Sequence, residues 1–146
     1  MPRMIFVNLP VSDLERSIAF YQSVGAVQNK QFSDSTASMV SFSHEINVML
    51  LTHERFRSFT TKAIADAHTS AQALLCLSAD SREAVDQLVN DAADAGASID
   101  PTPEQDHGFM YGRSFEDPDG HIWEIMWMDV EAAMNAAAPS QEPAIA

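Results

Sequence analysis

The order of expected secondary-structure elements repeats within the chain. A strand, a helix and further strands are expected in residues 6–52, and the same order returns in residues 74–128. Two copies of a unit too small to bury its own apolar face should pack together, and antiparallel strands with a helix on one side favour an α+β fold. We therefore predict one domain built from two tandem modules, residues 1–70 and 71–129, whose curved mixed sheets surround a cleft, followed by a loose tail at 130–146.

Local signals define the expected elements. One helix is predicted to begin at Ser12 or Asp13 and another at Asp80 or Ser81, because these side chains cap helix N-termini. Pro10 is expected to end the first strand. The sequence DPDG at residues 117–120 predicts a tight turn. Residues 54–70 read as a loop with a short helix. The expected strands are 4–9, 40–42, 47–52, 74–78, 109–116 and 121–128.

The net charge and the cysteine content limit which binding partners and which cellular compartment we expect. Eight Lys and Arg residues against 21 Asp and Glu residues give a net charge of −13, which disfavours nucleic acids and anionic membranes. No apolar run reaches the roughly 18 residues of a membrane span. The single cysteine excludes a disulfide framework and a Cys-rich zinc site. We expect a cytoplasmic protein that binds neither nucleic acid nor membranes.

Glu124 is the most informative single residue. It lies in the otherwise apolar segment IWEIMW at residues 122–127, where alternation puts Glu124 on one face and Trp123 on the other. A carboxylate in such a setting is costly unless it is paired, bound to a metal or protonated. It is either a functional group or an acid at the edge of a cleft that reaches water or an arginine.

Arg113 is the candidate partner of Glu124, depending on the register of the hairpin. A two-residue turn at Pro118 and Asp119 would place Arg113 opposite Glu124. A bulge at Gly120 would instead place Gly112 or Ser114 there. Arg113 could equally form a structural ion pair.

Four further side chains are candidates, each with a structural alternative. His107 and Tyr111 flank the start of the hairpin, where a loop histidine can act as an acid or a base, or can simply be exposed. Asn8 in the first strand should bond to a ligand or to neighbouring backbone. Cys76 has no basic neighbour in sequence, which favours packing over nucleophilic chemistry.

The two ends of the chain resemble one protein family. The segment VNLPVSDLERSIAFY at residues 7–21 and the segment FEDPDGHIWE at 115–124 resemble the opening and closing motifs of the vicinal oxygen chelate superfamily. That superfamily contains lactoylglutathione lyase (glyoxalase I), bleomycin and fosfomycin resistance proteins and extradiol dioxygenases. The whole chain is most similar to a small bacterial branch described as lactoylglutathione-lyase-like or dioxygenase-like. The resemblance implies two βαβββ modules and a homodimer, with a site shared between two chains in many members.

The resemblance also implies where a metal would be held. Glu124 matches the ligand position on the last strand. The other three positions fall on Phe6, Leu50 and Leu74, none of which can bind a metal. One carboxylate cannot hold a divalent ion with its usual four to six donors, so we predict no cofactor, while leaving open a metal held by Glu124 with His107 or another loop residue.

Two functions follow from this pattern. In the first, a lyase or isomerase acts on a carbonyl compound, with Glu124 as general base and Arg113, Tyr111 or His107 holding the oxygen on which charge develops. In the second, the chain binds and sequesters a small molecule, such as a drug or antibiotic, without chemistry. The residues expected to line the small-molecule cleft in both cases are Phe6, Asn8, Leu50, Thr52, Leu74, Cys76, Ser114 and Met126.

Overall fold

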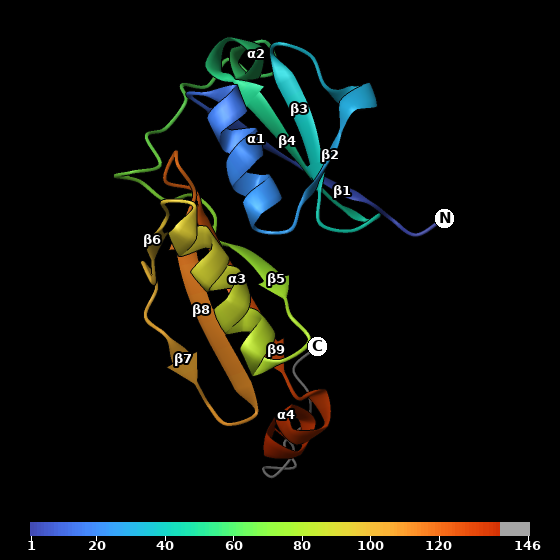
Figure 1. Cartoon of the computed structure of the whole chain (residues 1–146), viewed down its shortest axis with the longest axis vertical. Helices are drawn as coiled ribbons and strands as arrows, with labels where there is room; N and C mark the ends of the chain where they lie inside the picture. The colour runs from blue at the N-terminus through green and yellow to red at the C-terminus, as the bar shows by residue number, and fades with distance from the viewer. Residues whose placement is uncertain (138–146) are drawn as a thin grey trace.

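The computed structural model describes residues 1–137 and contains the predicted pair of modules (Figure 1). Both modules follow the order β-α-β-β-β, and their sheets have matching strand orders, β1-β4-β3-β2 and β5-β9-β8-β6. The first module consists of β1 (Ile5–Val11), α1 (Leu14–Ser23), β2 (Val27–Asn29), β3 (Ala37–Ser41) and β4 (Ile46–Thr52). The second consists of β5 (Leu75–Ser78), α3 (Arg82–Asp94), β6 (Ser98–Ile99), β8 (Met110–Glu116) and β9 (Ile122–Met128). The prediction of an α+β fold with tandem modules and mixed sheets is confirmed.

Four short elements complete the described chain. They are a 3-10 helix (Lys30–Phe32), α2 (His53–Arg57), β7 (Gln105–Asp106) and α4 (Val130–Ala137). Residues 138–146, the end of the predicted tail, lie outside the described residues. None of the helices within 1–137 is long and apolar enough to cross a bilayer.

The helix boundaries follow from capping. Asp13 accepts a hydrogen bond from the Arg16 backbone N–H at the start of α1, and Ser81 accepts one from the Ala84 N–H at the start of α3. Each helix is followed by a glycine with positive φ, Gly25 at +99° and Gly96 at +95°, the conformation that ends many helices.

The sequence predicted that the first strand ends at Pro10, and this prediction is wrong. β1 continues through Pro10 to Val11, and Pro10 pairs with Leu51 of β4. Among residues 1–137, β1 is the edge strand of its sheet, with β4 as its one partner strand. Because an edge position leaves one side without ladder hydrogen bonds, a proline is tolerated there.

One hydrophobic core joins the two modules. Figure 1 shows α1 and α3 on the same side of the sheets. The fully buried Tyr21 of α1 donates a hydrogen bond to Asp117 Oδ2 at 2.7 Å and accepts one from Trp123 Nε1 at 2.9 Å. Burial, and then the Asp117 carboxylate, raise the pKa of Tyr21 well above its ordinary value. Buried polar groups with complete hydrogen bonding fix a single packing arrangement, so this triad aligns the first helix with the last hairpin.

The 117–120 turn of the second module contacts the first module and the segment that links the two. Asp119 accepts a hydrogen bond from the Ser12 backbone N–H at 2.8 Å, just before α1. Gly120 has φ of +93°, and a Cβ placed on it would lie 2.7 Å from the carbonyl carbon of Ala67. The segment 58–74, which links the modules without a regular element, therefore passes directly over this turn.

Candidate ligand-binding site

Three neighbouring strands place a row of polar side chains on the open face of the second sheet. Cys76 of β5 pairs with Glu124 of β9, and Glu124 pairs with Ser114 of β8. Strand alternation sends the neighbours of Glu124, Trp123 and Ile125, into the core, where both are buried. Glu124 therefore faces away from the helices, as the sequence pattern predicted.

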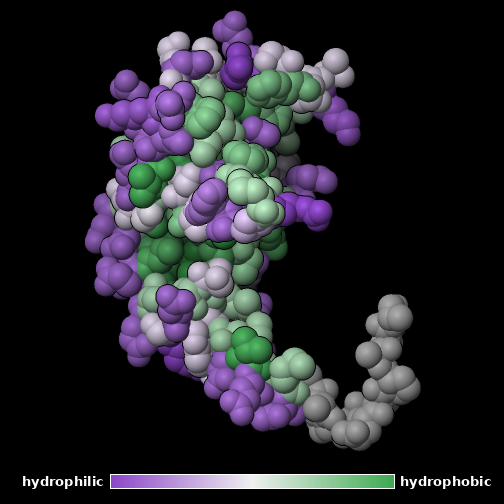
Figure 2. Space-filling model, turned by 90° about the vertical axis from the view of Figure 1, so that its right-hand side faces the viewer, coloured by the Kyte–Doolittle hydropathy of each residue, from purple (hydrophilic) through white to green (hydrophobic). Residues whose placement is uncertain are grey.

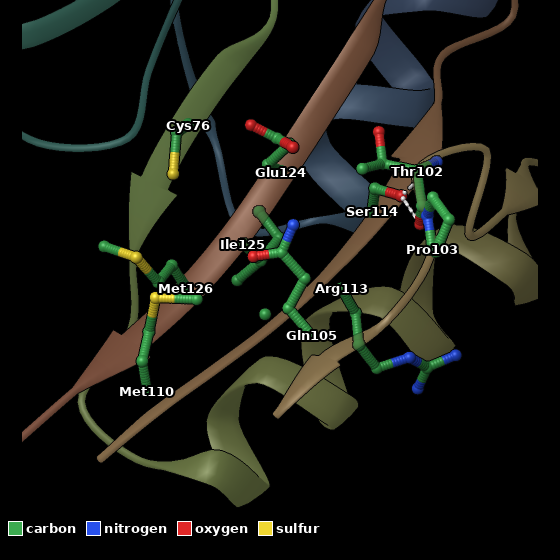
Figure 3. A pocket seen from close by; sticks show the side chains of 11 residues that line it. Cys76, Thr102, Pro103, Gln105, Met110, Arg113, Ser114, Glu124, Ile125 and Met126 are labelled. Carbon is green, nitrogen blue, oxygen red and sulfur yellow. Dashed lines mark hydrogen bonds between the residues drawn. The ribbon is translucent and has the colours of Figure 1, made fainter. Parts of the chain in front are cut away.

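This row borders a shallow depression of about 70 Å³. Figure 3 shows the Glu124 carboxylate and the Cys76 thiol at one side of it, with the Gln105 amide and the thioethers of Met110 and Met126 around it. Gly112 pairs with Met126 and with Gln105, and the missing side chain at this position helps to leave the space open. All eleven lining residues belong to the second module: Cys76, Thr102, Pro103, Gln105, Met110, Gly112, Arg113, Ser114, Glu124, Ile125 and Met126.

The Glu124 carboxylate has no protein partner among residues 1–137. It is half-buried, and it takes part in none of the hydrogen bonds or ion pairs of the described chain. Ser114, in contrast, is committed: its hydroxyl donates to the Thr102 carbonyl and accepts from the Thr102 N–H, both at 3.0 Å. Burial, and then the Glu124 carboxylate, raise the pKa of the Cys76 thiol. The depression thus contains one free carboxylate beside a protonated thiol and thioethers.

Arg113 and Tyr111 lie on the opposite face of the sheet from Glu124. The hairpin register pairs Ser114 with Glu124, so Arg113 pairs with Ile125. Figure 3 shows the Arg113 side chain running away from the Glu124 carboxylate. The placement of Arg113 opposite Glu124 is therefore wrong, and the alternative with Ser114 there is confirmed. A shift of one residue reverses the face of a strand side chain.

Arg113 and Tyr111 instead belong to an acidic cluster beside α3. Arg113 contacts Asp86 at 3.1 Å and Asp100 at 2.8 Å, and the Tyr111 hydroxyl donates to Asp86 at 2.6 Å. Hydrogen bonding to Asp100 raises the pKa of Arg113, and burial, together with Asp86, raises that of Tyr111. The hydrogen bond from Tyr111, assisted by Arg113, holds the pKa of Asp86 below its usual value. This cluster is an ion-pair network; of its members only Arg113 also borders the depression, and its guanidinium is held by Asp86 and Asp100.

His107 also lies apart from Glu124. It occupies the turn between β7 and β8, is exposed, and stacks on Phe109 with ring centroids 6.2 Å apart. It does not line the depression. The structure thus brings none of the three predicted helpers, His107, Tyr111 or Arg113, to the Glu124 carboxylate.

The first-module residues predicted to line the cleft do not all lie on the same face of the sheet. Phe6 and Asn8 lie on the open face, since Leu9 and Val11, at the alternate positions of β1, are buried in the core. Phe6 is 48% exposed. Thr52 caps α2 by accepting a hydrogen bond from the Arg55 N–H. None of these first-module residues lines the depression beside Glu124.

The prediction that Leu50 of the first module is equivalent to Glu124 of the second is wrong. It is fully buried in the core. Asn8 and Cys76 lie at the same distance before their helix caps, and Asn8 pairs with Met49 as Cys76 pairs with Glu124. Met49 is therefore the equivalent position, and the shift of one residue explains the error.

The positions equivalent to the family's metal ligands do not fit a divalent ion. They are Phe6, Met49, Leu74 and Glu124, which offer one carboxylate and one thioether. A divalent metal in a protein usually takes four to six nitrogen, oxygen or thiolate donors. Within the described part of the chain, no three His, Cys, Asp or Glu side chains gather closely enough to hold a metal.

A second polar depression was not foreseen from the sequence. His53, His68 and His121 line a hollow of about 260 Å³ together with Arg57. His121 contacts the Pro10 carbonyl at 2.9 Å. These histidines share no helical or strand spacing in the sequence. They meet because residues 58–74 fold back over the 117–120 turn, and no local pattern reveals such a contact.

Comparison with known proteins places the chain in a family. The model of the Glyoxalase/Bleomycin resistance protein/Dioxygenase superfamily matches residues 3–125. The fold and the paired modules agree with that match, and the chain belongs to this superfamily. A search of curated proteins finds no significant match.

Solved structures share the fold at low sequence identity. A hypothetical protein, SA1046, from S. aureus has 25% identity and a TM-score of 0.72, with 87% of this chain and 94% of that chain covered. A glyoxalase/bleomycin resistance protein/dioxygenase family enzyme from Burkholderia phytofirmans PsJN has 22% identity and a TM-score of 0.70, covering 87% and 99%. The fosfomycin resistance protein FosX from Listeria monocytogenes has 18% identity and a TM-score of 0.64, covering 90% and 97%.

Proposed function

We propose that this chain is a small-molecule-binding protein and that its Glu124 face recognises a ligand with a cationic group on an apolar body. The observation that carries the proposal is the free carboxylate of Glu124 at the edge of the depression. A half-buried carboxylate without a partner gains most from a ligand that supplies a positive charge.

The lining of the depression suits the apolar part of such a ligand. Met110 and Met126 are flexible and polarizable, so their side chains adapt to ligands of different shape. Pro103 adds further apolar surface. The net charge of −13 favours the approach of a cation, although salt screens this attraction beyond roughly 8 Å at physiological ionic strength. Sequestration of a basic small molecule needs nothing more than these features.

A second candidate is carbonyl chemistry of the lyase or isomerase type, with Glu124 as general base. It is supported by the Gln105 side chain, whose amide lies at the same depression and could donate a hydrogen bond to a developing oxyanion. Arg113 and Tyr111 are committed to the opposite face. The developing oxyanion would therefore meet only neutral hydrogen-bond donors. For this reason we rank binding above turnover.

We further propose that two copies pair through their open sheet faces. Phe6 and Leu74, at equivalent positions of the two modules, are 48% and 52% exposed. Figure 2, which views the molecule from the side, shows hydrophobic residues at the surface around its middle. Exposed large apolar side chains at equivalent positions of the two modules favour burial against another protein surface. Sedimentation of the wild type should give a dimer, and the double variant Phe6→Asp/Leu74→Asp should give a folded monomer.

Calorimetric titration with matched probes tests the binding proposal. Phenethylammonium should bind about tenfold more tightly than its uncharged analogue 2-phenylethanol, because one charge-assisted hydrogen bond contributes about 1.5–3 kcal/mol. Glu124→Gln should remove this preference. The control Glu83→Gln, on the exposed face of α3, carries the same charge change and should retain it.

The outcomes separate the two functions. Equal affinities for both probes, or a preference that survives Glu124→Gln, would refute cation recognition at this face. Exchange of the α-protons of hydroxyacetone in heavy water, followed by NMR, tests carbonyl chemistry. Exchange that is catalysed by the wild type and lost in Glu124→Gln would establish Glu124 as a base and overturn the ranking.

A further inference from the structure

A large cavity lies at the seam between the modules, away from Glu124. Its volume is about 470 Å³, within the roughly 300–1,000 Å³ typical of small-molecule sites. Its walls are residues 7–10 of β1, Phe56 of α2, Leu75 of β5, residues 120–122 at the start of β9, and the 60–73 part of the connecting segment. It shares no lining residue with the Glu124 depression. It adjoins the hollow lined by His53, His68 and His121, with which it shares Pro10, Ile64, Ala65, Ala67 and His121. The seam cavity is therefore separate from the Glu124 depression and differs from it in chemistry.

Small side chains create this hollow. Most of its lining is apolar, and the connecting segment contributes alanines at alternating positions around Ile64. Alanine adds apolar surface while filling little volume, so the backbone of the segment spans the seam without closing it. The alanines that line the cavity are Ala63, Ala65, Ala67, Ala71 and Ala73. An apolar hollow of this size gains free energy when an apolar ligand displaces its water.

The charge of the lining is the opposite of the charge of the protein. The chain carries 21 acidic residues, yet no Asp or Glu among the described residues lines the seam cavity, whereas Lys62 does. Within residues 1–137 the ion pairs are made by Arg16, Arg82 and Arg113, so the Lys62 ammonium has no carboxylate partner there. A free cation at an apolar hollow selects for an anionic group on the occupant.

We propose that the seam cavity binds an apolar molecule with one anionic group, of the kind represented by a medium-chain fatty carboxylate. The hydrocarbon body lies against the alanine-rich segment and β1, and the carboxylate lies at Lys62. This site is independent of the Glu124 face, which selects the opposite charge.

Calorimetric titration of the full chain with decanoate and with 1-decanol tests this site. Decanoate should bind the wild type about tenfold more tightly than the alcohol, as one partly exposed charge-assisted contact allows. Lys62→Gln should abolish that difference. Lys30→Gln is the matched control, because Lys30 is the only other lysine of the chain and lies in the exposed 3-10 helix; it should leave the difference unchanged.

A second variant tests the position of the hydrocarbon body. Ala71→Leu/Ala73→Leu adds bulk to the hollow and should abolish decanoate binding, while Glu124→Gln should leave it intact. Three results would overturn the proposal: no saturable decanoate binding, equal affinity for decanoate and 1-decanol, or decanoate affinity unaffected by Lys62→Gln. Failure of the phenethylammonium experiment at Glu124 would not alter any of these results.

Discussion

Gly120→Ala should be unusually damaging, because two separate constraints meet at this glycine. Its φ is +93°, which side chains rarely adopt, and a Cβ would lie 2.7 Å from both the Ala67 carbonyl carbon and the His68 nitrogen. Those atoms are backbone, so the overlap cannot be relieved by a side-chain rotation. The substitution must displace either the 117–120 turn or the segment that crosses it.

The loss of unfolding free energy in Gly120→Ala is the sum of a conformational cost and a steric cost. A non-glycine residue in the left-handed region costs about 1–2 kcal/mol. Forcing an additional methyl group into occupied space costs about 1–3 kcal/mol. Gly25 separates the terms, because its φ is +99° and an added Cβ would meet nothing within 4 Å. Gly25→Ala should show the conformational cost alone, and Gly120→Ala should exceed it by the steric cost.

Thermal unfolding followed by tryptophan fluorescence compares both variants with the wild type. For a chain of 146 residues, each kcal/mol lowers the melting temperature by roughly 3–4 °C, so Gly120→Ala should melt about 10 °C lower. Equal destabilisation by Gly120→Ala and Gly25→Ala would show that the segment does not pass over the turn. The account of the module junction would then be wrong.

Three further outcomes are expected. Tyr21→Phe should lower the free energy of unfolding by about 2–4 kcal/mol in urea titrations, because it leaves buried Asp117 and an indole N–H without their partner. Gly112→Val should keep the fold, since its Cβ would meet only one backbone oxygen at 3.6 Å, but it should reduce phenethylammonium affinity by filling the depression. Arg113→Met should cost about 1 kcal/mol at pH 7 and less at pH 3. The pKa of Asp86 is lowered in the folded state, so the stability it contributes is present above its ordinary pKa and is lost as pH falls through the lowered value.

Much of the fold could be predicted because its signals are local. The repeated order of elements, the capping side chains near Asp13 and Ser81, and the alternation that exposes Glu124 all depend on residues close together in the sequence. The short strands β2, β6 and β7 were missed because two or three residues carry no measurable periodicity. The continuation of β1 through Pro10 depends on the edge position of that strand, which a single segment does not reveal.

The candidate site was predicted less completely, for a related reason. Whether Arg113 or Ser114 stands opposite Glu124 depends on one residue of register, and the same single step moved the equivalent position from Leu50 to Met49. Strand alternation, by contrast, predicted the faces of Phe6 and Glu124, and both side chains lie on the open face.

The sequence by itself determined the two modules, their helices and the face on which Glu124 lies, because backbone periodicity and capping act over a few residues. Only the tertiary structure decided the commitment of Arg113 to the α3 side, the gathering of three histidines at one hollow, and the seam cavity beside Lys62. These features arise where segments that are not neighbours in the sequence meet, from Arg113 and Asp100, 13 residues apart, to the seam cavity, where residues 7–10 meet residues 60–73. Their contacts depend on the register and path of the whole chain, which no local stretch encodes.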